Sequence, residues 1–138
     1  MKNTESLLTD LLAESTRSFI NQDINSISEF ISDDFTFEFH FEKDDKKWIN
    51  RGNKEEFLEV YRKLFSSGVR CISWDYKIIS SSKTFFGKIK ATLLFTCVGE
   101  REGEQPQETT NIENIVCVVK NGRLKLTKIE SHAGKQNL

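Results

Sequence analysis

A run of phenylalanines at alternate positions sets the strongest limit on the fold. The four residues are Phe35, Phe37, Phe39 and Phe41. Side chains alternate between the two faces of a β-strand, so all four rings point to one side if residues 33–42 form a strand. A helix does not gather positions of this spacing on one side. The pattern therefore predicts a strand whose aromatic face lines a core or a pocket.

Length and composition predict a single domain over residues 1–138, because 37% hydrophobic residues suffice for one core in a chain of this size. The net charge of −1, without a basic cluster, argues against a nucleic-acid partner. No apolar run approaches the length of a membrane span, and no signal-peptide core is present. We therefore expect a soluble, cytoplasmic protein without a membrane partner.

The cysteines are too few and too widely spaced for a disulfide framework. Cys71, Cys97 and Cys117 are odd in number and contain no C-x-x-C pair. We expect three free thiols inside strands, in a reducing compartment. The sequence indicates no cofactor.

Three segments have apolar residues at the three-to-four spacing of amphipathic helices. They are residues 4–21, 24–31 and 54–67. Asp23 is placed to cap the second helix, and Asn53 to cap the third. The helices come before most of the expected sheet.

The expected strands alternate apolar and polar residues. Beyond residues 33–42, they are residues 48–52, 72–78, 85–97, 112–120 and 123–132. The polar, acidic stretch 99–111 is expected to be a mobile loop, and Asn121-Gly122 predicts a type I′ turn. This order predicts an α+β fold, in which three helices pack on the concave face of a curved antiparallel sheet.

Three groups of residues carry a resemblance to a known family. Residues 21–37 combine an acidic turn, an amphipathic helix, two acids and a strand. In residues 51–57 a glycine precedes the start of a helix. Residues 121–124 form the turn of the closing hairpin. In this order the chain resembles the nuclear transport factor 2-like superfamily, in particular its bacterial SnoaL-like and ketosteroid-isomerase-like members. The resemblance implies a cone-shaped barrel with an apolar pocket, closed at one end by the helices, and frequent homodimers.

The same resemblance implies no particular reaction. Family members include isomerases, cyclases, dehydratases, epoxide hydrolases and non-catalytic domains. The catalytic base of the isomerases falls at or next to Phe39, the oxyanion-binding tyrosine near Ser15, and the second acid near Ile115. None of these side chains can replace the residue it stands for, so the catalytic residues remain unassigned.

Aromatic side chains on several segments either fill a core or form the wall of a pocket. Two polar residues share the inward parity that we assign to the last two strands, and a carboxylate in such a setting would have a raised pKa. The candidate ligand-binding residues are Phe37, Phe39, Trp48, Tyr61, Trp74, Tyr76, Glu113 and Ser131.

Neither histidine indicates a metal site at this level. His40 shares the polar face of its strand, which favours a solvated or interface position, and His132 is expected at the surface or at the rim of the pocket. The two lie on distant segments without inward acids at ligand spacing, so no metal site is expected.

An apolar outer face of the sheet predicts a partner, most simply a second copy of the chain. The outward residues are expected to be Leu94, Val116, Val118, Leu124 and Leu126.

Three hypotheses follow for the function. The first is a protein that binds a small apolar ligand, with no reaction assigned. The second is an enzyme of the isomerase, cyclase or dehydratase kind that uses Glu113 with Tyr61 or Tyr76. The third is a non-catalytic dimeric assembly module whose interior is solid core.

Overall fold

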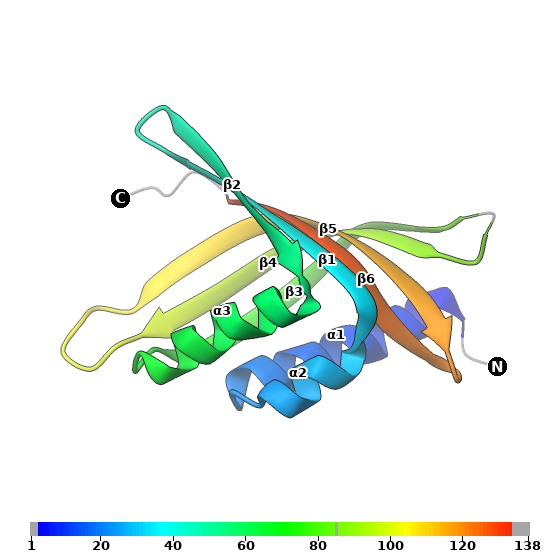
Figure 1. Cartoon of the computed structure of the whole chain (residues 1–138), viewed down its shortest axis with the longest axis horizontal. Helices are drawn as coiled ribbons and strands as arrows, with labels where there is room; N and C mark the ends of the chain where they lie inside the picture. The colour runs from blue at the N-terminus through cyan, green and yellow to red at the C-terminus, as the bar shows by residue number, and fades with distance from the viewer. Residues whose placement is uncertain (1–2, 85, 134–138) are drawn as a thin grey trace.

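The computed structural model describes residues 3–84 and 86–133, and in this part three helices lie on one face of a twisted, six-stranded sheet (Figure 1). The helices are α1 (Thr4–Ile20), α2 (Ile24–Phe30) and α3 (Lys54–Ser66). The strands are β1 (Ile31–Lys43), β2 (Lys46–Asn53), β3 (Arg70–Lys83), β4 (Ile89–Glu100), β5 (Gln107–Lys120) and β6 (Arg123–Ala133). The expected α+β class is confirmed. No helix in the described part of the chain is long and apolar enough to cross a membrane.

Side chains cap the helices where the sequence predicts. The Asp23 carboxylate accepts a hydrogen bond from the Ser26 amide at the start of α2. Asn53 and Glu56 form a capping box at the start of α3, in which each side chain accepts from the backbone amide of the other. These caps fix the points at which the chain passes from α1 into α2 and from β2 into α3.

The sheet is mixed, which corrects the expectation of an antiparallel sheet. Its strand order is β2-β1-β6-β5-β4-β3, and β1 pairs with β6 in parallel. The other four pairs are antiparallel, because a turn joins each of them directly and reverses the chain. No such turn connects β1 to β6, so their relative direction is free of this constraint.

The alternating phenylalanines of β1 face the helices, as predicted. Phe35 and Phe37 are 1% and 3% exposed, Phe39 is half-buried, and Phe41 is 36% exposed beyond the helical layer. Three of these rings contact Phe57 of α3, with centroid distances of 4.9, 5.6 and 6.1 Å from Phe35, Phe37 and Phe39. The stripe therefore runs from the core at one end of β1 to solvent at the other.

Two residues expected on the outer face lie in the core. Leu124 and Leu126 are 5% and 8% exposed. The cause is a bulge: Val116 pairs with Lys128 and the next residue, Cys117, pairs with Leu126, so Thr127 is the extra residue of β6. The bulge reverses the alternation for the residues of β6 that precede Thr127, so Leu124 and Leu126 point into the core. The outer face of the sheet therefore lacks two of the apolar residues expected there.

Several strand boundaries also differ from expectation, and β3 continues to Lys83, beyond the expected end at residue 78. The turn between β4 and β5 spans only residues 101–106, because residues 107–111 pair with residues 95–99 of β4. β4 begins at Ile89, Gly87 lies in a turn with φ +79°, and Phe85 lies outside the described residues. The expected loop over 99–111 is therefore wrong for residues 99–100, which belong to β4, and for residues 107–111, which belong to β5.

Candidate functional site

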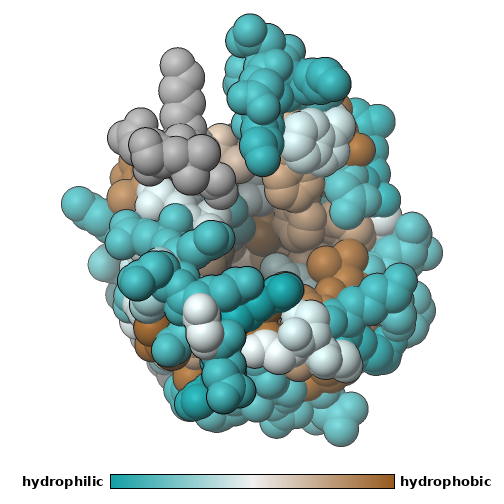
Figure 2. Space-filling view, turned by 90° about the vertical axis from the view of Figure 1, so that its left-hand side faces the viewer, coloured by the Kyte–Doolittle hydropathy of each residue, from teal (hydrophilic) through white to brown (hydrophobic). Residues whose placement is uncertain are grey.

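A cavity of about 560 Å³ lies between the helices and the concave face of the sheet. Figure 2 shows its entrance as a hollow with a hydrophobic interior surrounded by hydrophilic residues. The interior is enclosed by the three helices and all strands except β2, while Asn50 of β2 and the β4–β5 turn contribute polar residues. The arrangement is that of a pocket with an apolar wall and a polar entrance.

Aromatic rings form a continuous chain of contacts around this cavity. Ring centroids along the chain are 4.2 to 6.1 Å apart. Its members, in order, are Phe39, Phe57, Tyr61, Phe19, Trp74, Phe95 and Tyr76. Phe19 of α1 stacks on Trp74 of β3 with an interplanar angle of 9°. Because every ring between the two ends contacts two others, the chain makes a well-defined wall.

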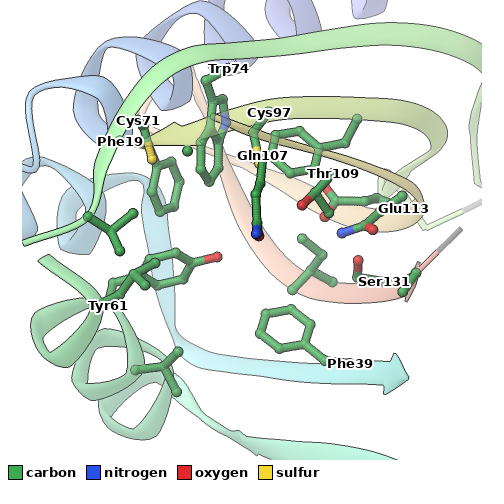
Figure 3. Close-up of a pocket in the computed structure, with 18 of the residues that line it drawn as sticks. Phe19, Phe39, Tyr61, Cys71, Trp74, Cys97, Gln107, Thr109, Glu113 and Ser131 are labelled. Atoms are coloured by element: carbon green, nitrogen blue, oxygen red, sulfur yellow. The ribbon is translucent and has the colours of Figure 1, made fainter. Parts of the chain in front are cut away.

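One strand supplies a row of polar side chains to the same cavity. Gln107, Thr109, Asn111 and Glu113 occupy alternate positions of β5 and all line the cavity. Figure 3 shows three of them, Gln107, Thr109 and Glu113, on the side opposite Tyr61. The next inward positions of β5 belong to the buried core, so Glu113 marks the inner end of the row.

Glu113 is a buried carboxyl group at the cavity, with 6% of its surface exposed. Burial raises its pKa from 4.5 to about 7, and a hydrogen bond from the Ser131 hydroxyl acts in the opposite direction. Ser131 lies opposite Glu113 in the β5–β6 pairing and also lines the cavity. Glu113 can therefore hold or release a proton near neutral pH, which is the property required of a general acid or base.

Two tyrosine hydroxyls share the cavity with Glu113. The Tyr76 oxygen accepts a hydrogen bond from Trp74 Nε1 at 2.8 Å and lies 2.9 Å from Ser15 Oγ. Tyr61 makes no hydrogen bond through its side chain within the described part of the chain, and its hydroxyl points into the cavity in Figure 3. Burial first, and then the Glu113 carboxyl, raises the pKa of both tyrosines, so both hydroxyls stay protonated and can donate to a ligand.

Asn111 offers an acceptor beside these donors. Its Oδ1 is buried and has no hydrogen-bond partner among the described residues. A buried acceptor without a partner is unfavourable by about 1–3 kcal/mol, and a ligand that donates a hydrogen bond would relieve this. Cys71 and Cys97 also line the cavity, and burial raises the pKa of both, that of Cys97 to about 11, so these thiols stay neutral.

The structure brings together six of the eight candidate residues from the sequence. The six that line the cavity are Phe39, Tyr61, Trp74, Tyr76, Glu113 and Ser131. Phe37 packs beneath them against Phe57, where Gly52 leaves room for its ring, since a Cβ on Gly52 would lie 2.7 Å from Phe37 Cε1. Trp48 is 48% exposed and stacks on Phe41 instead.

Sequence reasoning missed Gln107, Thr109 and Asn111. Their polar character and the nearby proline indicated a loop, whereas they belong to the cavity face of β5. The available signal was parity, because all three lie an even number of residues from Glu113.

The positions implied by the family resemblance are only partly at the cavity. Phe39 and Ser15 line it, whereas Ile115 is 4% exposed in the core. Tyr76 brings a hydroxyl to Ser15 from β3, and Glu113 lies two residues before Ile115 on the same strand. The cavity thus contains a carboxyl group and phenol groups, supplied by other positions than the isomerase pattern uses.

No family profile matches the sequence, and no curated protein matches it. Solved structures match nearly its full length. A conserved protein from Planctomyces limnophilus has a TM-score of 0.78 at 13% identity, with 94% of this chain and 95% of that chain covered. An NTF2-like protein from Cytophaga hutchinsonii has a TM-score of 0.69 at 16% identity, with 96% and 100% covered. A ketosteroid-isomerase-like protein from Erwinia carotovora has a TM-score of 0.72 at 14% identity, with 98% and 100% covered.

The burial of Glu113 predicts a pH-dependent stability. Between about pH 4.5 and 7 the folded chain holds a proton that the unfolded chain releases, so the free energy of unfolding falls as the pH rises through this range. Relative to Glu113→Gln, the wild type should lose up to about 3 kcal/mol between about pH 4 and pH 8. Urea unfolding of both proteins across this range measures the difference.

Glu108→Gln is the matched control, because Glu108 is an exposed residue of the same strand. Its unfolding free energy should follow that of the wild type at every pH. Parallel pH profiles for the wild type and Glu113→Gln would show that Glu113 ionises in the folded chain as it does in water.

Proposed function

Starting from the nuclear transport factor 2-like fold, we propose that this chain binds a small, mainly apolar molecule with one hydrogen-bonding group. The observation that carries the proposal is a cavity of about 560 Å³ with an aromatic wall around one buried carboxyl, Glu113. This volume lies within the range of about 300–1,000 Å³ typical of pockets for small ligands. It also disfavours the alternative of an assembly module with a solid core.

The lining residues favour a neutral ligand that donates and accepts hydrogen bonds at one end. Glu113 in its protonated form donates, Asn111 Oδ1 accepts, and the aromatic rings contact the apolar remainder. Among the described lining residues Arg101 is the one strong base, and it lies in the β4–β5 turn at the entrance. An anionic ligand would therefore meet the Glu113 carboxyl without a compensating cation at the inner wall.

A cavity-filling substitution tests the ligand site. Thr109→Trp directs an indole into the cavity from β5, while Thr110→Trp places the same group on the outer face, where Thr110 is exposed. A panel of bicyclic phenols and ketones, such as 2-naphthol and 2-tetralone, serves as the probe in calorimetric titrations. We expect binding to the wild type and to Thr110→Trp, and at least about a tenfold loss of affinity in Thr109→Trp because the volume is filled.

The controls for this experiment are the unfolding temperatures of both variants without ligand. Equal loss of affinity in both variants, or no binding of any probe to the wild type, would contradict a ligand site in this cavity.

We propose proton transfer on a bound carbonyl compound as the second candidate function. The supporting observation is the pKa of about 7 of Glu113, together with the protonated hydroxyls of Tyr61 and Tyr76 in the same cavity. A carboxylate can remove a proton next to a carbonyl, and a phenol can donate to the oxyanion that forms. The ketosteroid-isomerase-like protein from Erwinia carotovora has the same fold, which is compatible with this chemistry.

Deuterium exchange tests this second candidate directly. In deuterium oxide, a probe ketone such as 2-tetralone should incorporate deuterium at its α-carbon faster with the protein than without it, as measured by mass spectrometry. The rate should rise through pH 7 as Glu113 ionises and should return to the uncatalysed rate in Glu113→Gln. Exchange that persists in Glu113→Gln would assign the base elsewhere, and tight binding without exchange would leave ligand binding as the function.

We also propose that the chain forms a homodimer through the outer face of the sheet. With Leu124 and Leu126 in the core, the outward apolar side chains on β4 and β5 are Leu94, Val98, Ile112, Val116 and Val118, of which Ile112 is 38% exposed. Apolar side chains on the exposed face of a sheet are typical of a protein interface.

A charge at this face should separate the two copies. Val118→Glu should give a particle of the 16.0 kDa expected for one chain in light scattering, where the wild type gives twice this mass. Val119→Glu is the matched control, because Val119 alternates to the other face and is already 48% exposed, and it should remain dimeric. A monomeric wild type would refute the dimer.

A further inference from the structure

The two histidines of the chain occur in the same short pattern. Each follows a glutamate by two positions, as Glu38-Phe39-His40 and Glu130-Ser131-His132. The parallel pairing of β1 and β6 places Glu38 opposite Glu130 and His40 opposite His132. The residues between them, Phe39 and Ser131, line the cavity, so alternation directs the four side chains to the outer face, although His40 also borders the cavity. Two segments that are far apart in sequence therefore present a two-by-two array of imidazoles and carboxylates.

The side chains of this array converge on one point. The two imidazole rings stack with centroids 4.3 Å apart and an interplanar angle of 19°. Both Nε2 atoms face the same oxygen, Glu130 Oε1, at 2.7 Å from His132 and 3.9 Å from His40. All three donor atoms lie within 4.8 Å of one another.

Glu38 is the fourth residue of the array. Its Oε1 lies 2.6 Å from His40 Nε2, while Arg51 Nε holds its other oxygen at 3.3 Å. This contact pairs His40 Nε2 with a carboxylate, but its geometry is poor for a hydrogen bond although the nitrogen is buried. A nitrogen atom that is shielded from water, lacks a well-formed hydrogen bond and lies next to two carboxylates has the surroundings of a metal ligand.

We propose that His40, His132 and Glu130 bind a divalent transition-metal ion of the zinc class, with Glu38 as the fourth ligand. Two imidazole nitrogens and two carboxylate oxygens suit Zn²⁺, Cu²⁺ or Ni²⁺, whereas Mg²⁺ and Ca²⁺ prefer oxygen ligands alone. In a tetrahedral zinc site with bonds of about 2.0–2.1 Å, neighbouring ligand atoms are about 3.3 Å apart. The observed contacts between nitrogen and oxygen donors, at 2.6, 2.7 and 3.9 Å, lie on both sides of this spacing.

The bound ion would join the two strands whose pairing no turn supports. β1 and β6 are the parallel pair of the sheet, and His40 and His132 are separated by most of the chain. An ion that binds the folded chain alone stabilises it in proportion to the logarithm of its concentration over the dissociation constant. The site would therefore stabilise the β1–β6 pair even when no ligand occupies the cavity.

Zinc titration of the untagged, chelator-treated chain tests this proposal. Because the chain contains two histidines in all, histidine-dependent binding can come only from this pair. Calorimetry should give one Zn²⁺ per chain, and the unfolding temperature should rise with Zn²⁺ but not with Mg²⁺. His40→Gln and His132→Gln should each lower the Zn²⁺ affinity by at least about 100-fold, since changes outside the ligand shell already cost about 10–100-fold.

The matched control is the double variant Cys71→Ser/Cys97→Ser, which removes the other soft donors near one another, at the cavity. Its Zn²⁺ affinity should equal that of the wild type. Zinc affinity that survives in His132→Gln but is lost in the cysteine variant would overturn the proposal, as would an untagged wild type that binds no zinc.

Copper gives a readout that needs no substitution. The electron paramagnetic resonance spectrum of the wild type with one equivalent of Cu²⁺ should show hyperfine coupling to two equivalent imidazole nitrogens. Coupling to a single imidazole nitrogen, or none, would contradict joint ligation by His40 and His132.

Discussion

The packing of three phenylalanine rings against Phe57 fixes which way β1 faces, and both candidate sites depend on this. Phe35, Phe37 and Phe39 all contact that ring on α3. A shift of β1 by one residue would turn the buried rings of Phe35 and Phe37 to solvent, at a cost of several kcal/mol. The same alternation directs His40 to the outer face. The aromatic contact therefore decides what lies inside the cavity and what lies on the outer face.

The cavity stays open because an apolar aromatic wall faces a polar wall, and the two cannot pack against each other favourably. The aromatic rings hold one another at centroid distances of 4.2 to 6.1 Å, so the apolar wall is already packed. Facing it, β5 presents Gln107, Thr109, Asn111 and Glu113 before it turns apolar. Collapse would press these polar groups against the rings without partners, at about 1–3 kcal/mol for each group. Glu113 lies where the strand changes from cavity wall to core, and its raised pKa follows from that position.

Features set by neighbouring residues were predictable from the sequence, whereas features set by distant pairing were not. The facing of the β1 phenylalanines and the caps at Asp23 and Asn53 depend on local spacing, and both predictions are confirmed. The bulge at Thr127 carries no local mark, because an extra residue becomes visible only against its partner strand. Counting alternate positions of β6 across that bulge predicts Leu126 on the outer face, whereas it lies in the core.

The candidate site was predictable to the same extent. Glu113 was found because its parity could be counted from an apolar strand, but Asn111 was missed because the strand continues into residues that resemble a loop. The repeated Glu-x-His pattern was visible in the sequence, yet it had no meaning without the parallel register of β1 and β6. A short motif of this kind becomes a candidate site only when topology places its two copies side by side.

The parallel pair β1–β6 connects the two candidate sites physically. Phe39 and Ser131 pair across these strands, and each lies between the glutamate and the histidine of its own strand. Because neighbouring residues of a strand share one backbone on opposite faces, an ion that fixes the spacing of His40 and His132 also fixes the spacing of Phe39 and Ser131 at the cavity. Thermodynamic linkage then requires that any effect of the ion on ligand affinity be matched by an equal effect of the ligand on ion affinity. The outer face and the cavity are therefore two sides of one pair of strands, so the effect of a substitution on either side should be measured at both sites.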